Sequence, residues 1–243
     1  MYDWNPNWVS QVACAFGLGQ ATGLNGIDET PGLIPDPDWK QKTKAQAWEV
    51  IDSLNLGIGQ GDVQVTPLQI ARMLAAVGNN GLLSQPQLVL KVVPVGGPLS
   101  YQFQPIFTGQ LPLKPDQLAA LQEGLHNVTQ DPIGTARSHF RGLIIPVAGK
   151  TGTAETGQPD PHAWFAGYNF AHRADKPDIA IAVWVRNIGE GADVAAPIFR
   201  RIVESYFGLP LTRYPWEDSV GAVKTPTPSP TPDGTGATAT PTP

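Results

Sequence analysis

VAGKTGTAE (residues 147–155) places one lysine and two threonine hydroxyls beside glycines, directly after an apolar, strand-like run. Because alternate side chains of a strand face the same side, we expect Thr151 and Thr153 to point the same way. An edge strand also leaves backbone N–H groups free to bind an extended peptide or to hold an oxyanion. Gly152 lets a ligand approach the backbone closely, and Lys150 adds a fixed positive charge.

Two further strand-like runs follow this stretch, at residues 162–168 and 178–185. The short links between the runs favour antiparallel pairing. An amphipathic pattern over residues 195–207 predicts a helix that covers one face of the resulting sheet. We therefore predict an α+β fold in which an antiparallel sheet is flanked by helices.

Helices are also predicted in the first half of the chain, at residues 8–16 and directly after Thr66 and Lys114. Thr66 is a favourable N-cap, and the proline that follows it suits the first helical position. Residues 20–40 are rich in glycine, proline and aspartate and predict a long surface loop, while residues 88–93 predict a strand. The expected packing face of the Thr66 helix comprises Leu68, Ala71, Leu74, Ala75 and Gly78.

The composition of the 243-residue chain excludes several classes of function. The net charge of −5 gives no basic surface for nucleic acid. A single cysteine, Cys14, excludes an internal disulfide, and we expect it to be a small buried core residue. The four histidines are scattered without metal-ligand spacing, so neither a metal nor a cofactor is predicted. The longest strongly apolar run, residues 179–185, is far shorter than the roughly 20 residues that cross a bilayer.

The end of the chain differs from the rest. Residues 225–243 consist almost wholly of Thr, Pro, Gly, Ser and Ala, a composition that cannot form a core. We expect one folded region at residues 1–209 and a Pro/Thr-rich disordered tail at residues 210–243.

Several stretches, in one order, resemble a single family. Together they look like the transpeptidase domain of class B, high-molecular-weight penicillin-binding proteins, and the likeness spans residues 8 to about 208. Lys-Thr-Gly alone is a weak signal that serine β-lactamases share, whereas the ordered set is highly specific. The stretches are FGLG with TG (16–23), IGQG (58–61), TPLQ (66–69), NNG (79–81), AGKTGTAE (148–155), HAWFAGY (162–168) and AAPIF (195–199).

The resemblance implies peptidoglycan D,D-transpeptidation, in which a serine attacks the penultimate D-Ala carbonyl of a stem peptide and an amine resolves the acyl-enzyme. Lys150 would tune the charge of the site and favour the substrate carboxylate, which Thr151 and Thr153 would hold. The backbone N–H of Thr153 would be one donor of the oxyanion hole, and Gly152 would keep the edge open. Residues 60–64 and 156–161 would lie around the cleft.

The resemblance also implies partners and a location. The ligands would be stem peptides ending in D-Ala-D-Ala, and β-lactams if the full domain is present, with proteins of cell elongation or division as partners. The location would be the extracytoplasmic face of the bacterial plasma membrane, with an N-terminal anchor that lies outside this chain.

The chain departs from the family at the nucleophile. The family serine belongs to a Ser-x-x-Lys motif, and none of the eight serines here has a lysine three residues on. Ser53-Leu54-Asn55 fits the letters of the second family motif but lies in the wrong place, so we interpret it as coincidence. We therefore expect the C-terminal part of a transpeptidase domain, N-terminally incomplete, inactive toward penicillin by itself, and with exposed apolar surface.

Two alternatives remain. One is a catalytically silent module that binds peptidoglycan or division partners without turnover. The other is a β-lactamase or β-lactam sensor, against which the stretches at residues 58–61 and 66–69 argue, because they are typical of the biosynthetic family.

Overall fold

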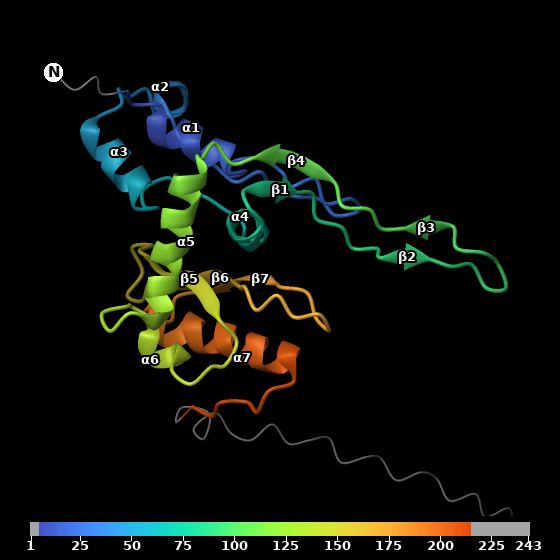
Figure 1. Cartoon of the computed structure of the whole chain (residues 1–243). Coiled ribbons are helices and arrows are strands. Elements are labelled where there is room, and N and C mark those ends of the chain that lie inside the picture. The colour runs from blue at the N-terminus through green and yellow to red at the C-terminus, as the bar shows by residue number, and fades with distance from the viewer. Residues whose placement is uncertain (1–4, 215–243) are drawn as a thin grey trace, which may run out of the picture. The chain divides into compact units, whose positions relative to one another are not determined.

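The computed structural model describes residues 5–214 (Figure 1). The chain divides into one compact unit, Met1–Pro210, and a second, Leu211–Pro243, of which only the first four residues are described. Residues 215–243 of the predicted tail lie outside the described residues. The helices are α1 (Trp8–Ala15), α2 (Pro37–Lys44), α3 (Val50–Gly57), α4 (Pro67–Gly78), α5 (Pro115–Gln130), α6 (Arg137–Phe140) and α7 (Ala196–Phe207), with the π-helical turn η1 (Gly191–Ala195). The strands are β1 (Leu82–Ser84), β2 (Lys91–Val92), β3 (Tyr101–Gln102), β4 (Phe107–Gln110), β5 (Val147–Ala154), β6 (His162–Asn169) and β7 (Ala180–Val185).

The central sheet is a three-stranded antiparallel meander in the order β5-β6-β7. Gly149 lies opposite Gly167, and Gly152 lies opposite Trp164. One side of β5 pairs with β6, and the other is an edge of this sheet. The predicted α+β fold, the antiparallel pairing and the edge position of the Lys150 strand are therefore confirmed.

Each face of the sheet packs against its own apolar core. On one face, Val147, Phe165 and Val183 pack with Phe199 of α7. On the opposite face, residues one position along each strand, such as Ala148 and Ala166, pack with α4 and α5. This alternation is the two-residue period of a strand. Figure 1 shows α7 and α4 on opposite sides of the sheet.

Helix α4 begins as the sequence predicts but buries a different face. Thr66 accepts a hydrogen bond from the Gln69 amide (3.2 Å), and the Gln69 side chain accepts one from the Thr66 amide (2.8 Å), which completes a capping box. Of the five expected packing residues only Leu74 is buried, since the others are half-buried. Gln69 and Arg72 are among the buried residues instead, because the N-terminal loop offers carbonyl groups to Gln69 and strand β1 offers one to Arg72.

Gln69 joins α4 to the long N-terminal loop. Its side chain is 1% exposed, and its Nε2 donates to the carbonyls of Gln20 (2.7 Å) and Pro31 (2.9 Å). Arg72 acts similarly toward β1 and β4, with Nε donating to the Ser84 carbonyl (2.7 Å) and Nη2 to the Thr108 hydroxyl (2.5 Å). Burial lowers the pKa of Arg72.

Glu29 orders the same loop from within. Its carboxylate accepts hydrogen bonds from the Thr22 hydroxyl (2.6 Å) and from the amides of Thr22 (2.9 Å), Gly23 (2.9 Å) and Leu24 (2.8 Å). Loss of hydration alone would raise the pKa of Glu29, but these hydrogen bonds outweigh it and lower the pKa. The Glu29 carboxylate thus fixes the backbone of residues 22–24 within this loop.

Three local predictions were wrong. Residues 20–40 are not loop throughout, because Asp36 caps α2 by accepting from the Trp39 amide (2.7 Å) and Pro37 occupies the first helical position. Cys14 is exposed rather than buried, because Ser10 makes the buried contact of α1 through a hydrogen bond to the Pro35 carbonyl (2.7 Å). The strand predicted at residues 88–93 shrinks to the two residues of β2.

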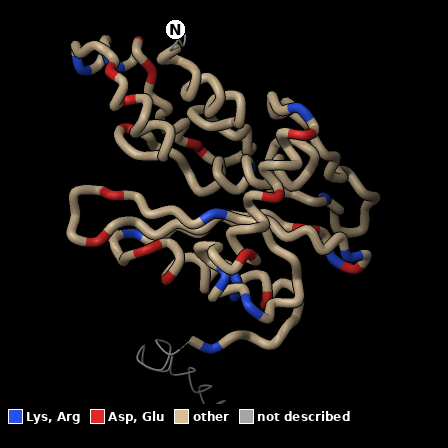
Figure 2. Tube along the Cα trace, turned by 60° about the vertical axis from the view of Figure 1, so that its left-hand side comes forward, with Lys and Arg blue, Asp and Glu red and all other residues tan. Residues whose placement is uncertain are grey.

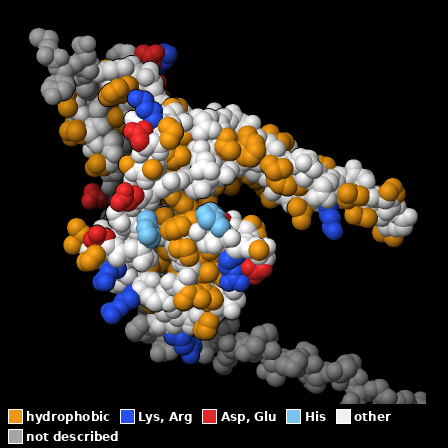
Figure 3. Space-filling model, in the orientation of Figure 1, with side chains coloured by type: hydrophobic (Ala, Val, Ile, Leu, Met, Phe, Trp, Pro, Cys, Tyr) orange, Lys and Arg blue, Asp and Glu red, His pale blue; other side chains and the backbone are white. Residues whose placement is uncertain are grey.

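The β2–β3 hairpin extends away from the body of the first unit and is rich in exposed apolar side chains (Figure 3). Leu88, Leu90 and Val93 are all more than half exposed, so no element within residues 5–214 covers them, and the ladder stays short. Apolar side chains are exposed also on α1 and α3, where Trp8 is 71% and Leu54 is 61% exposed. Among residues 5–214, no helix combines the length and apolarity needed to cross a bilayer.

Charged residues of both signs are interspersed along the chain (Figure 2), in keeping with the low net charge.

Replacing Gln69 with the apolar Met, of similar size, is expected to lower the free energy of unfolding by about 2–4 kcal/mol, because the buried side chain loses its hydrogen bonds to the Gln20 and Pro31 carbonyls and to the Thr66 amide. Chemical denaturation of the chain measures this value. Gln11→Met, at an exposed position of α1, is the matched control and should change the stability by less than about 0.5 kcal/mol. Equal effects of both substitutions would contradict the stabilising role of the Gln69 hydrogen bonds.

The contribution of Glu29 to stability is expected to depend on pH. Since its folded-state pKa is lowered, the stabilisation is complete above the ordinary glutamate pKa of about 4.3 and is lost as pH falls through the lower folded-state value. The difference in unfolding free energy between the wild type and Glu29→Gln should therefore be largest near neutral pH and narrow below about pH 4. Asp28→Asn removes a neighbouring carboxylate that makes none of these hydrogen bonds, and controls for net charge.

Candidate functional site

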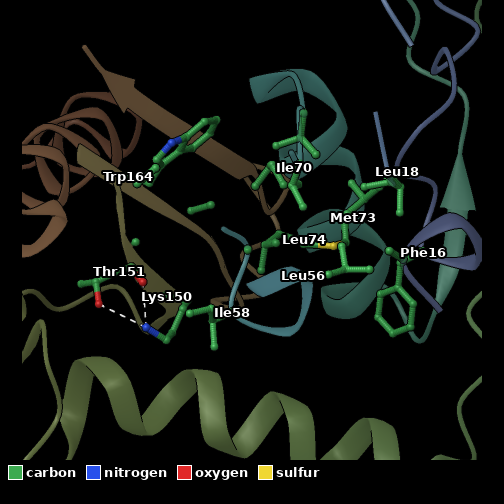
Figure 4. A pocket seen from close by; sticks show the side chains of 18 of the residues that line it. Phe16, Leu18, Leu56, Ile58, Ile70, Met73, Leu74, Lys150, Thr151 and Trp164 are labelled. Carbon is green, nitrogen blue, oxygen red and sulfur yellow. Dashed lines mark hydrogen bonds between the residues drawn. The ribbon is translucent and has the colours of Figure 1, made fainter. Parts of the chain in front are cut away.

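The two faces of β5 carry different chemistry. Lys150 lies on the face of β5 that packs toward α4, as the alternation of side chains along the strand requires. Thr151 and Thr153 lie on the opposite face, where they contact the segment before α6 and η1. The prediction that both threonines point the same way is confirmed by these contacts. The lysine still reaches the sheet edge, because its Nζ donates to the Thr151 carbonyl (2.7 Å) and lies 3.4 Å from the Thr151 Oγ1 (Figure 4).

Each threonine hydroxyl also contacts residues outside β5. The Thr151 Oγ1 lies 3.0 Å from the Thr135 Oγ1, and either oxygen can donate. The Thr153 hydroxyl donates to the Glu190 carboxylate (2.6 Å) and accepts from the Gly191 amide (3.4 Å). Sequence reasoning missed Thr135 and Glu190, since each lies far from β5 in the chain and outside any motif.

The backbone of β5 presents polar groups at the free edge. The Thr153 carbonyl accepts from the Gln60 Nε2 (3.1 Å), just as the Thr151 carbonyl accepts from Lys150. In an antiparallel strand the N–H and C=O of one residue point to the same side. The Thr153 N–H therefore faces the edge rather than β6, which is the orientation that an oxyanion donor needs.

Gln60 belongs to the segment between α3 and α4, which sequence reasoning placed around the cleft without giving it a role. Its hydrogen bond to Thr153 shows that this segment meets the end of β5. The bond crosses 93 residues of sequence, so no local pattern could have indicated it.

A cavity of about 490 Å³ opens beside the edge of β5. Residues 150–154 form one wall, while apolar side chains from α1, α3, α4, α5, β6 and the loops beside them form the rest (Figure 4). Ile58 lies near Lys150, and Phe16, Leu18 and Met73 lie at the far end. No serine is among the residues that line this cavity in the part of the chain that is described.

Together these groups can bind an anionic end of an extended ligand. A lysine charge, the Thr151 hydroxyl and outward-facing amides suit a carboxylate on a chain that adds to the sheet edge. Across residues 5–214, no group of three or more His, Cys, Asp or Glu side chains could hold a metal ion.

The chain is similar to proteins of known family. A family model described as the penicillin binding protein transpeptidase domain matches residues 4–204. "Peptidoglycan D,D-transpeptidase MrdA" of Haemophilus influenzae is 31% identical over 216 residues, which cover 82% of this chain and 32% of the relative. The chain thus spans about a third of the length of the curated relatives that it matches.

Solved structures agree with this likeness. Pseudomonas aeruginosa PBP2, in complex with WCK 5153, has a TM-score of 0.69 and 33% identity over 82% of this chain and 43% of that one. Helicobacter pylori PBP2, in a complex with MreC, has a TM-score of 0.65 and 29% identity over 82% of this chain and 35% of that one.

The match to the family model covers most of the chain, and both the fold and the Lys-Thr-Gly strand at the sheet edge are consistent with it. The chain therefore belongs to the penicillin-binding protein transpeptidase domain family.

Proposed function

We propose that this chain supplies the carboxylate-binding side of a peptidoglycan D,D-transpeptidase active site. The observation that carries the proposal is the edge of β5, where Lys150, Thr151 and the Thr153 amide stand together. The ligand is a stem peptide that ends in D-Ala-D-Ala, and it lies along β5 as an added strand.

Each group has a role in this proposal. The Lys150 ammonium attracts the terminal carboxylate, and the hydroxyls of Thr151 and Thr153 position it. The Thr153 N–H stabilises the negative charge that develops on the penultimate carbonyl oxygen. A serine oxygen bonds to that carbonyl carbon as D-Ala leaves, and an amine of a second stem peptide then displaces the serine oxygen.

We assign the nucleophilic serine to no residue of this chain, since no Ser-x-x-Lys occurs in its sequence. The relatives are about three times as long, and we infer that the nucleophile and a membrane anchor belong to sequence outside these 243 residues. The protein then acts at the extracytoplasmic face of the bacterial plasma membrane. The Helicobacter pylori relative was solved with MreC, and we propose a partner of cell elongation or division for this protein as well.

A catalytically silent peptidoglycan-binding module is the second candidate, and the missing Ser-x-x-Lys favours it. Both candidates need the same carboxylate subsite, and they differ in whether a nucleophile reaches it. A β-lactamase is disfavoured, because the named relatives are transpeptidases and penicillin-binding proteins.

The carboxylate subsite is testable with the chain itself. Acetyl-D-Ala-D-Ala is expected to bind more tightly than its C-terminal carboxamide, with NMR shifts at the amides of β5. Lys150→Met should weaken binding of the acid about tenfold, because a charge-assisted contact is lost. Lys91→Met, on an exposed strand, should change neither affinity. Equal binding of acid and carboxamide, unaffected by Lys150→Met, would falsify the proposal.

Covalent reaction with penicillin separates the subsite from the nucleophile. We expect the chain to carry no label after incubation with a fluorescent penicillin and denaturation, because it lacks Ser-x-x-Lys. A complete family member serves as the positive control. A labelled band at the mass of this chain would show that another residue acts as nucleophile.

A further inference from the structure

The proton of the Thr153 hydroxyl is already used in a hydrogen bond to Glu190. A threonine hydroxyl has one proton to donate and two lone pairs to accept with. The proton is directed at the Glu190 Oε2 (2.6 Å), and the Gly191 amide approaches one lone pair (3.4 Å). What remains is acceptor capacity, which a ligand carboxylate cannot use, because an ionised carboxylate is itself only an acceptor.

The backbone fixes Glu190 in this position. A Cβ at the next residue, Gly191, would lie only 2.3 Å from the carbonyl oxygens of Gly152 and Trp164, so the loop lies directly against β5 and β6. The Glu190 carbonyl accepts from the Val194 amide (3.1 Å), which ties it to the turn of η1. The Glu190 side chain therefore starts from an anchored point beside Thr153.

Thr151 differs from Thr153 in this respect. Its partner is another hydroxyl, that of Thr135 (3.0 Å). The two hydroxyls hold two protons and use one between them, so one proton stays available for a ligand. The Thr135–Thr151 pair can bind a carboxylate as it stands, whereas Thr153 cannot.

We propose that Glu190 is a specificity-determining residue that competes with the ligand carboxylate for the Thr153 hydroxyl proton. The inference rests on the proposed function, because it assigns a role at the same carboxylate subsite. A ligand carboxylate can accept the Thr153 hydroxyl proton only by displacing the Glu190 carboxylate. The two negative charges also repel each other. A ligand whose terminal group donates hydrogen bonds, such as a carboxamide, binds the free lone pair of Thr153 without displacing Glu190. Glu190 thus lowers the preference of the site for carboxylates over amides.

The test measures the affinities of acetyl-D-Ala-D-Ala and its C-terminal carboxamide for the full chain by calorimetry or NMR titration. Glu190→Ala removes both the hydrogen bond and the charge, and should tighten binding of the acid about tenfold without tightening that of the carboxamide. Glu190→Gln removes the charge and keeps the shape, and should give a smaller change in the same direction. Asp193→Asn is the matched control, since it removes one exposed negative charge from the adjoining turn without contacting β5 hydroxyls.

The outcomes separate this inference from the function on which it rests. If Lys150→Met weakens binding of the acid but neither Glu190 variant tightens it, the inference is wrong and the proposed function stands. If the wild type does not distinguish acid from carboxamide and Lys150→Met has no effect, both are wrong. An equal gain with Asp193→Asn would assign the effect to net charge and would also overturn the inference. Thermal unfolding of each variant checks the fold, and Glu190→Gln decides if Glu190→Ala is destabilised.

Discussion

The pairing of Gly149 with Gly167 is the constraint on which the site depends. A Cβ at Gly149 would lie 2.7 Å from the Ala166 carbonyl oxygen, and one at Gly167 would lie 2.2 Å from that of Ala148. Only glycine fits on both strands at this point, so the register of β5 on β6 is determined one residue before Lys150. A slip by a single residue would exchange the faces of the strand. The lysine would then point toward α7, and the threonines would face α4.

Polar contacts also position the other side of the cleft. Gln69 attaches the N-terminal loop to α4, and Glu29 determines the shape of that loop. The segment between α3 and α4 then brings Gln60 to the Thr153 carbonyl. Two apolar cores thus support the two faces of the sheet. The hydrogen bonds of Glu29, Gln60 and Gln69 position the N-terminal loop and the segment between α3 and α4 near its edge.

Much of the fold could be predicted from local patterns. Thr66 with Pro67, the alternation in β5, β6 and β7, and the amphipathic period of α7 each specify their own element. The wrong predictions concern properties that depend on the surroundings. The segment at residues 88–93 has the composition of a strand, yet nothing among the described residues packs on it, and Cys14 has a helical apolar neighbourhood but faces solvent. In the site, Lys150, Thr151 and Thr153 could be named from the sequence, because one strand carries them all. Gln60 could be placed around the cleft but given no role, and Thr135 and Glu190 could not be named, because all three reach β5 only through the fold.

The contact between Gly191 and the carbonyls of Gly152 and Trp164 has a consequence for how this family can diverge. Position 191 tolerates no side chain without moving the loop off the sheet, whereas the side chain of position 190 is exposed and contributes little to the core. The same loop therefore joins a position that the backbone restricts to glycine to one whose side chain can be replaced without disturbing the core. Evolution, or a protein engineer, can alter the charge beside Thr153 by a single codon while the backbone that presents it stays in place.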